Sequence, residues 1–153
     1  MKDAVYLIRH AQAGDRRRWE DLDLLRPLNR AGARQADALV GTLREAAVTR
    51  LLSSPYVRCV QTLEPMAAER DLPIEVSEDL AEGTPVERAL ALVERASVGA
   101  VLCSHGDVIE GALLALRRRG VLGGSPLVFP KGSVWELHRE GGRVVGARYL
   151  SPP

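Results

Sequence analysis

The chain has 153 residues, the usual length of one domain, and we expect residues 1–153 to form a single domain. Its 46% apolar and 27% charged residues are ordinary for a soluble globular protein, and a net charge of +1 indicates neither nucleic-acid nor membrane binding. No apolar run approaches the ~18 residues of a membrane-spanning helix, and the stretch before Arg9 is too short for a signal peptide. We expect a cytoplasmic protein in which Cys59 and Cys103 are buried thiols.

The first half of the chain predicts two strands separated by a long irregular segment and a helix. Residues 4–8 are a continuous apolar run, typical of a strand buried on both faces. Residues 12–28 have no regular pattern, and a segment of that length in a compact domain is usually functional or mobile. Asn29 can cap a helix, and residues 51–52 predict a short strand. The apolar stripe of this helix is Ala36, Leu39, Val40, Leu43 and Ala47.

The second half repeats the alternation of helices and strands. Ser54-Pro55 and Thr84-Pro85 each predict a helix start with proline at the first helical position. Residues 74–76 predict an edge strand between these two helices. Residues 99–103 predict a second strand buried on both faces, and another helix begins at about Gly106.

The C-terminal segment predicts a hairpin. Residues 133–139 and 143–150 read as two strands that flank Glu140-Gly141-Gly142. Strands that alternate with helices imply right-handed crossovers and a mostly parallel sheet. The expected fold class is therefore α/β: a three-layer α/β/α sandwich with a mostly parallel sheet, a C-terminal hairpin and no cap subdomain.

Two of the three histidines, His10 and His105, directly follow the two most apolar strands. Open α/β sheets bind ligands at the carboxyl ends of their strands, so neighbouring strands would bring both imidazoles into one crevice. Arg9 adjoins the first histidine, and Arg58 lies in the first turn of a helix. The backbone N–H of Gly106, at another helix start, is available to an anion. Two imidazoles, two guanidinium groups and helix N-termini predict a pocket for a dianion such as a phosphoryl group.

His10 is the candidate nucleophile of this pocket. A neutral imidazole is a competent nucleophile near neutral pH, and neighbouring arginines would favour its neutral form. A metal site is the competing use of two histidines. It is disfavoured because arginines flank the site and no cysteine or carboxylate has ligand spacing.

Three motifs span nearly the whole chain: LIRHAQAG at residues 7–14, SSPYVRCVQT at 53–62 and VLCSHG at 101–106. In this order they resemble the signatures of the histidine phosphatase superfamily, the phosphoglycerate mutase-like proteins. RPLNRAG at residues 26–32 is most similar to the short phosphohistidine phosphatase branch. RCVQTLEP at 58–65 and KGSVW at 131–135 are similar to the phosphatase domain that follows a Nudix domain in some bacterial enzymes.

The resemblance implies a metal-independent phosphatase without a cofactor, acting through a phosphohistidine intermediate on His10. Arg9, Arg58 and His105 would bind and neutralise the transferring phosphoryl group, together with the Gly106 N–H.

Larger relatives use a glutamate to protonate the leaving oxygen. Glu82, in a loop before a helix start, is the best match, and the alternatives are Glu78 and Asp79. A P–N bond has a better leaving group and would need less help from an acid.

Two basic features of residues 12–28 have alternative interpretations. Arg26 is a candidate for substrate binding; otherwise it pairs with Asp21 or Asp23. Residues 16–19 (RRRW) would clamp an extended phosphate chain or a nucleotide base, or they form a solvated basic loop.

Chain length favours hydrolysis over a mutase reaction, in which the phosphoryl group is returned to the bound intermediate. Only 46 residues separate Arg58 from His105, and two helices, two strands and a loop use all of them. A phosphoglycerate mutase needs a covering subdomain to exclude water, whereas an open site admits it. The predicted partner is a phosphorylated substrate: a phosphohistidine on a protein or a small phosphomonoester, with a nucleotide or nucleoside polyphosphate as the alternative. A non-catalytic phosphate-binding adaptor is disfavoured because all four core residues are present.

Overall fold

The structure, a computed structural model, describes residues 3–153 and is built on a six-stranded sheet. The strands are β1 (Ala4–Arg9), β2 (Arg50–Ser53), β3 (Ile74–Val76), β4 (Ala100–Ser104), β5 (Val134–Glu140) and β6 (Arg143–Leu150). Their order in the sheet is β3-β2-β4-β1-β5-β6. The first four strands in this order are parallel to one another, whereas β5 pairs antiparallel with both β1 and β6. This confirms the predicted α/β class, the edge position of residues 74–76 and the C-terminal hairpin.

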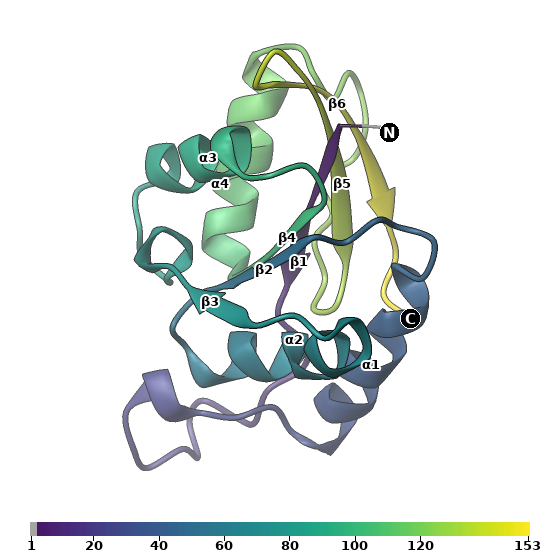
Figure 1. Cartoon of the computed structure of the whole chain (residues 1–153). Coiled ribbons are helices and arrows are strands. Elements are labelled where there is room, and N and C mark those ends of the chain that lie inside the picture. The colour runs from purple at the N-terminus through teal and green to yellow at the C-terminus, as the bar shows by residue number, and fades with distance from the viewer. Residues whose placement is uncertain (1–2) are drawn as a thin grey trace.

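Within residues 3–153, four α-helices cover the two faces of the sheet (Figure 1). They are α1 (Arg30–Thr42), α2 (Val57–Arg70), α3 (Val86–Arg95) and α4 (Gly106–Arg118), and two 3-10 turns, η1 (Asp23–Leu25) and η2 (Glu78–Leu80), lie between them. Tyr6 and Ile8 of β1 face a core with α1 and α2, and Val5 and Leu7 face a second core with α3 and α4. The alternation of β1 side chains between two apolar cores confirms the predicted three-layer sandwich.

Two helix starts differ from the sequence prediction. Helix α2 begins at Val57 rather than Pro55, because the Oγ of Ser54 accepts a hydrogen bond of 3.3 Å from the Tyr56 N–H and keeps the chain in a turn. Pro85 is the N-cap of α3, with ψ 135°, rather than its first helical residue.

The predicted apolar stripe of α1 is too long at its C-terminal end. The helix ends at Thr42, so Ala47 lies outside it. The guanidinium group of Arg70 on α2 donates to the carbonyls of Leu43 and Ala46, at 2.6 and 2.9 Å. These carbonyls accept hydrogen bonds from the neighbouring helix α2, and they do not form a further turn of α1.

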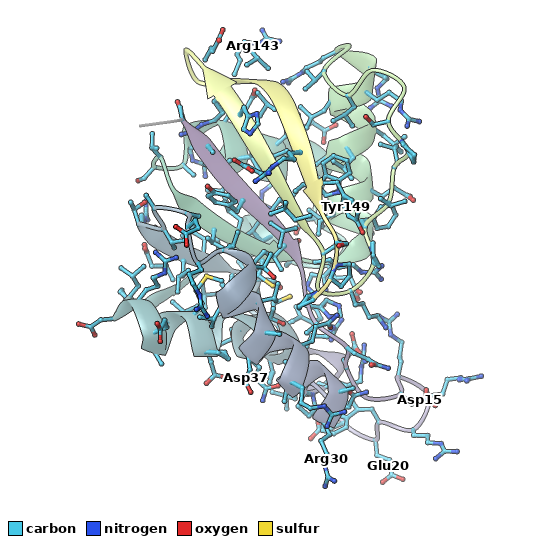
Figure 2. All side chains as sticks on the ribbon, turned by 90° about the vertical axis from the view of Figure 1, so that its right-hand side faces the viewer. Asp15, Glu20, Arg30, Asp37, Arg143 and Tyr149 are labelled. Atoms are coloured by element: carbon cyan, nitrogen blue, oxygen red, sulfur yellow. The ribbon has the colours of Figure 1, made fainter. Side chains whose placement is uncertain are left out.

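Three features of the fold position the site. β1 and β4 are parallel neighbours with Arg9 opposite Ser104, so the residues after both strands emerge side by side. The segment between Arg58 and His105 consists of α2, β3, η2, α3 and β4, as predicted, without an inserted subdomain. Residues 12–28 extend beyond the sheet, and Figure 2 shows Asp15 and Glu20 at the outer end of this loop. Among residues 3–153 no helix has the length and apolarity needed to cross a membrane.

Candidate active site

The structure brings His10 and His105 together at the carboxyl ends of β1 and β4. The His10 N–H donates to the Ser104 carbonyl at 3.0 Å, which extends the parallel ladder by one residue. The two imidazoles meet edge to face with centroids 5.4 Å apart, and both rings are buried. The two imidazoles therefore lie together, as expected from adjacent strand ends.

The hydrogen bond of the His10 ring defines its tautomer. Nδ1 lies 2.7 Å from the Ala11 carbonyl, which can only accept, so Nδ1 carries the proton and Nε2 carries the lone pair. Burial is the main cause that lowers the pKa of His10 to about 3. The hydrogen bond to Ala11 raises this pKa, and the charges of His105, Arg58 and Arg9 lower it further. The expected neutral ring is supported, although burial contributes more than the arginines.

His105 is held from its other side. Its Nε2 lies 2.8 Å from the Oγ of Ser54 and 3.5 Å from the Sγ of Cys59. Its Nδ1 is buried, has no hydrogen-bond partner within residues 3–153, and lies 3.9 Å from Oε1 of Glu82. The nitrogen that faces Glu82 is thus the one left for a ligand.

Arg9 is positioned by residues distant in the sequence. Its Nη1 donates to the Phe129 carbonyl at 3.0 Å, and its Nε is buried without a partner in the described chain. The guanidinium group packs against Gly106, the first residue of α4. A Cβ at that position would lie 2.9 Å from the Cζ of Arg9. Glycine therefore makes the space that the cation occupies.

Arg58 is fully buried, and two acidic residues hold it. Its Nη1 donates to the Asp23 carbonyl at 3.0 Å, and its Nη2 donates to Oδ2 of Asp23 at 3.0 Å and to Oε1 of Glu82 at 3.4 Å. The guanidinium carbon lies 4.8 Å from the centroid of the Tyr56 ring. These contacts leave Nε without a partner among residues 3–153.

Among the three predicted acids, Glu82 is the one with contacts to the site. Its Oε1 also accepts a hydrogen bond of 3.1 Å from Nη2 of Arg16. Asp79 instead binds Arg88 and Arg95 of α3, at 2.7 and 3.1 Å. Glu78 is exposed on η2.

The basic residues of the 12–28 loop are divided between the site and solvent. The buried Arg26 bonds to Oδ1 of Asp23 at 2.9 Å and to the Gly14 carbonyl at 2.5 Å, which is the alternative ion pair considered from the sequence. Arg26 and Arg58 are linked through the Asp23 carboxylate, to which both guanidinium groups bind. Arg17 is exposed, and the Nε1 of Trp19 donates to a carbonyl of its own loop.

Several residues that build the site were not singled out from the sequence. Thr62, one helical turn after Arg58, accepts from the Ala11 N–H at 3.0 Å and donates to the Arg58 carbonyl at 2.7 Å. Gln61 accepts from the Leu28 N–H at 2.8 Å and so fixes the far end of the loop. The signal was the Gln-Thr pair within the second motif. Ser54 and Asp23 carried no separate signal for their site contacts.

Within residues 3–153, no group of three or more histidine, cysteine or acidic side chains is arranged to hold a metal ion. The groups that converge on the crevice are instead two imidazoles and two guanidinium groups, a set suited to a phosphoryl dianion.

Comparison with known proteins agrees with this geometry. The sequence profile of the Histidine phosphatase superfamily (branch 1) matches residues 5–89. The chain is 37% identical, over 97% of its length, to an 8-oxo-(d)GTP phosphatase of Mycolicibacterium smegmatis. The chain spans about half of that protein, 48%.

Solved structures have the same fold. A structure from Agrobacterium tumefaciens assigned as the phosphohistidine phosphatase SixA is 25% identical, with a TM-score of 0.75 over 99% of both chains. The protein histidine phosphatase SixA complexed with tungstate is 23% identical, with a TM-score of 0.74 over 97% of this chain and 94% of the other.

Proposed function

Since the chain belongs to the histidine phosphatase superfamily, we propose that it is a metal-independent phosphatase that hydrolyses a phosphomonoester or a phosphohistidine through a covalent intermediate on His10. The observation that carries this proposal is the hydrogen bond from His10 Nδ1 to the Ala11 carbonyl. It leaves the lone pair on Nε2 of a buried, neutral imidazole. Because this lone pair is free, His10 needs no general base for the attack, and Arg9, Arg58 and His105 are left to bind the phosphoryl oxygens.

In the first step, Nε2 of His10 forms a bond to phosphorus while the bond to the leaving oxygen or nitrogen breaks. Glu82 supplies a proton to the leaving atom. The two guanidinium groups bind the phosphoryl oxygens, and charge stabilisation of this kind is the main contribution to phosphoryl transfer. His105 donates from Nδ1, because the Ser54 hydroxyl can donate to its Nε2.

In the second step, water attacks the phosphohistidine and the N–P bond breaks. The Glu82 carboxylate accepts a proton from that water, which restores both residues and releases inorganic phosphate. The lack of a covering subdomain between Arg58 and His105 supports access of water and favours hydrolysis over return of the phosphoryl group to a second acceptor.

Turnover of an aryl phosphate by the purified protein tests the proposal. His10→Ala is expected to abolish turnover and also the acid-labile phosphate label trapped on the protein. The control is His138→Ala, which removes the histidine of β5 that lies next to Glu136. Undiminished turnover by His10→Ala would exclude the mechanism.

A second candidate substrate class is a nucleotide or nucleoside polyphosphate cleaved by the same chemistry. It is favoured by the 37% identity to an 8-oxo-(d)GTP phosphatase. One protein sample assayed against phosphohistidine peptides, sugar phosphates and nucleoside polyphosphates separates the two classes by kcat/KM.

We also propose that residues 1–153 act as one domain and that the protein works in the cytoplasm. Cys59 and Cys103 are free thiols, and both are buried. This supports a reducing compartment.

A further inference from the structure

A hollow of about 520 Å³ adjoins the candidate acid Glu82. Residues of η1, of the turn before α2 and of the loop between η2 and α3 line it. Its apolar lining consists of Leu24, Pro55, Tyr56, Ala81 and Pro85. Apolar walls with a few polar groups are typical of sites that bind small organic molecules, and the proposed mechanism assigns no role to this hollow.

Tyr56 and Glu82 belong both to this hollow and to the phosphoryl site. The Tyr56 ring meets the His105 imidazole edge to face, with centroids 4.6 Å apart, and its centroid lies 4.8 Å from the guanidinium carbon of Arg58. Oε1 of Glu82 lies 3.4 Å from Nη2 of Arg58 and 3.9 Å from Nδ1 of His105. The hollow is therefore one side chain away from both groups that would bind the phosphoryl oxygens.

The loop that carries Glu82 is anchored on the two elements that flank the second histidine. The Ser104 hydroxyl, at the end of β4, donates to the Leu80 carbonyl at 2.6 Å. On the other side of Glu82, the Gly83 N–H donates to Oδ2 of Asp107, in the first turn of α4, at 2.9 Å. Because the loop is tied on both sides, the hollow keeps a fixed position relative to the two histidines.

The charges of the lining disfavour an anionic group. Arg88 is the one cation that lines the hollow among residues 3–153, and its guanidinium group is paired with Asp79 at 2.7 Å. Glu78 and Glu82 bring carboxylates to the same hollow. A phosphate or carboxylate in this space would meet like charges, whereas an apolar group would gain by covering Leu24, which is 39% exposed.

We propose that this hollow binds the leaving group and selects phosphomonoesters whose alcohol or phenol is apolar and uncharged, with Leu24 and Tyr56 as the specificity-determining side chains. This inference rests on the proposed phosphatase function, because the leaving atom must come within hydrogen-bond reach of the carboxyl that protonates it. A group attached to that atom next to Glu82 meets the apolar wall of the hollow. When Nε2 of His10 bonds to phosphorus, the ester P–O bond breaks, Glu82 protonates the oxygen, and the neutral alcohol leaves through the hollow.

The kinetic test uses phenyl, 2-naphthyl and 3-carboxyphenyl phosphate, whose phenols have nearly the same pKa. Each kcat/KM is divided by that for phenyl phosphate, which cancels any change in the chemical step. We expect this ratio to be about tenfold for 2-naphthyl phosphate, from burial of its second ring, and below one for the anionic 3-carboxyphenyl phosphate. Leu24→Ser should reduce the naphthyl ratio about threefold, and Leu24→Lys should raise the carboxyphenyl ratio.

Leu22→Ser is the matched control for Leu24→Ser. Leu22 is a leucine of the same loop that is 66% exposed and is not part of the lining. Its replacement should leave both ratios within about twofold of those of the unmodified protein, as expected for a surface position away from the substrate.

A binding test needs no turnover. In calorimetric titration of His10→Ala, 2-naphthyl phosphate should bind about tenfold more tightly than phenyl phosphate, and adding Leu24→Ser should reduce this preference. If the naphthyl preference is absent or independent of Leu24 while phenyl phosphate turnover still requires His10, the leaving-group subsite is wrong and the phosphatase function stands. If the preference in binding depends on Leu24 but no ester is turned over, the apolar selectivity of the hollow stands and the phosphatase function is wrong.

Discussion

The Oγ of Ser54 lies 2.8 Å from Nε2 of His105, and this contact leaves Nδ1 as the ring nitrogen without a hydrogen-bond partner in the described chain. The same Oγ accepts a hydrogen bond from the Tyr56 N–H, so its own hydrogen is available to Nε2. With Nε2 as the acceptor, the single proton of a neutral His105 ring is on Nδ1. In the proposed mechanism, Ser54 is therefore a positioning residue for the hydrogen bond from His105 to the substrate.

Ser54→Ala is expected to lower kcat by about tenfold, since it leaves Nε2 of the buried ring with only the weaker contact to the Cys59 Sγ, and losing such a hydrogen bond costs about 1–3 kcal/mol. The His105 ¹⁵N chemical shifts should move toward a mixture of tautomers, a change that a purely structural role would not cause. Ser53→Ala is the matched control, because that buried hydroxyl donates to the Ser54 carbonyl and not to His105. Equal losses of kcat without a shift in the His105 signals would contradict the assignment.

The acid sensitivity of the fold is expected to depend on His10. Because its pKa is about 3 in the folded protein and 6.5 ordinarily, only the unfolded chain binds this proton between those pH values. The free energy of unfolding should therefore fall as pH decreases through this window, with a contribution from His10 of about 3 kcal/mol by pH 4.5. In urea unfolding, His10→Gln should lose correspondingly less stability between pH 7 and 4.5. Identical slopes for the wild type and His10→Gln would refute the prediction.

Two glycines of α4 should separate activity from stability. In Gly106→Ala the new Cβ meets the guanidinium group of Arg9, the mobile end of a side chain, so the fold adapts and kcat/KM falls about tenfold or more. In Gly111→Ala the Cβ meets a methyl group of Val86 at 2.1 Å, where α3 packs on α4. That variant should lose about 1–3 kcal/mol of stability, the usual cost of overpacking. Thermal melts and kcat/KM of both variants are the measurements; a Gly106→Ala protein with normal kcat/KM would contradict the position of Arg9.

Asp23 contacts the guanidinium group of Arg58, and in the proposed mechanism it would both orient this group and compete with phosphate for it. Burial raises the pKa of the Asp23 carboxyl, but the hydrogen bonds and charges of Arg26 and Arg58 outweigh this, and its pKa is lowered. Asp23→Asn removes a negative charge 3.0 Å from the Arg58 guanidinium. We expect kcat to fall about tenfold while the inhibition constant of phosphate decreases by a few-fold. Asp21→Asn is the control, and weaker phosphate binding at unchanged kcat is the opposing result.

The order of the elements could be predicted because apolar runs and helical stripes are local signals. Residues 4–8 and 99–103 match β1 and β4 to within one residue at each end. The start of α1 was also predicted, because Asn29 caps it, but the C-terminal end of α1 and the start of α2 could not be predicted in this way. They depend on contacts from elsewhere in the chain: Arg70 binds the carbonyls after α1, and Ser54 binds His105.

The pairing of His10 with His105 at the centre of the site could be predicted for a related reason. His10 and His105 follow parallel strands, and the carboxyl ends of adjacent parallel strands meet at one edge. No comparable rule predicts the contacts of the loop formed by residues 12–28. Its position depends on single hydrogen bonds, such as those from Arg58 to Asp23 and from the Leu28 N–H to Gln61, and no local pattern encodes them.

The role of Glu82 can be tested through the leaving group. Its Oε1 lies 3.9 Å from Nδ1 of His105, next to the two histidines. If Glu82 donates the proton, Glu82→Gln should lower kcat/KM by about 10²–10⁴-fold for an alkyl phosphate, the usual range of general acid catalysis. The loss should be much smaller for 4-nitrophenyl phosphate or a phosphohistidine peptide, because these leaving groups need little protonation.

Glu78→Gln is the matched control for this series, since Glu78 is an exposed acid of the preceding turn. It should change kcat/KM by less than about twofold for every ester, as expected for a solvated carboxylate. The informative quantity is the slope of log kcat/KM against the pKa of the leaving group. A steeper slope in Glu82→Gln assigns proton donation to Glu82. Parallel slopes with a uniform loss would instead mean that Glu82 acts by holding Arg16 and Arg58 in place.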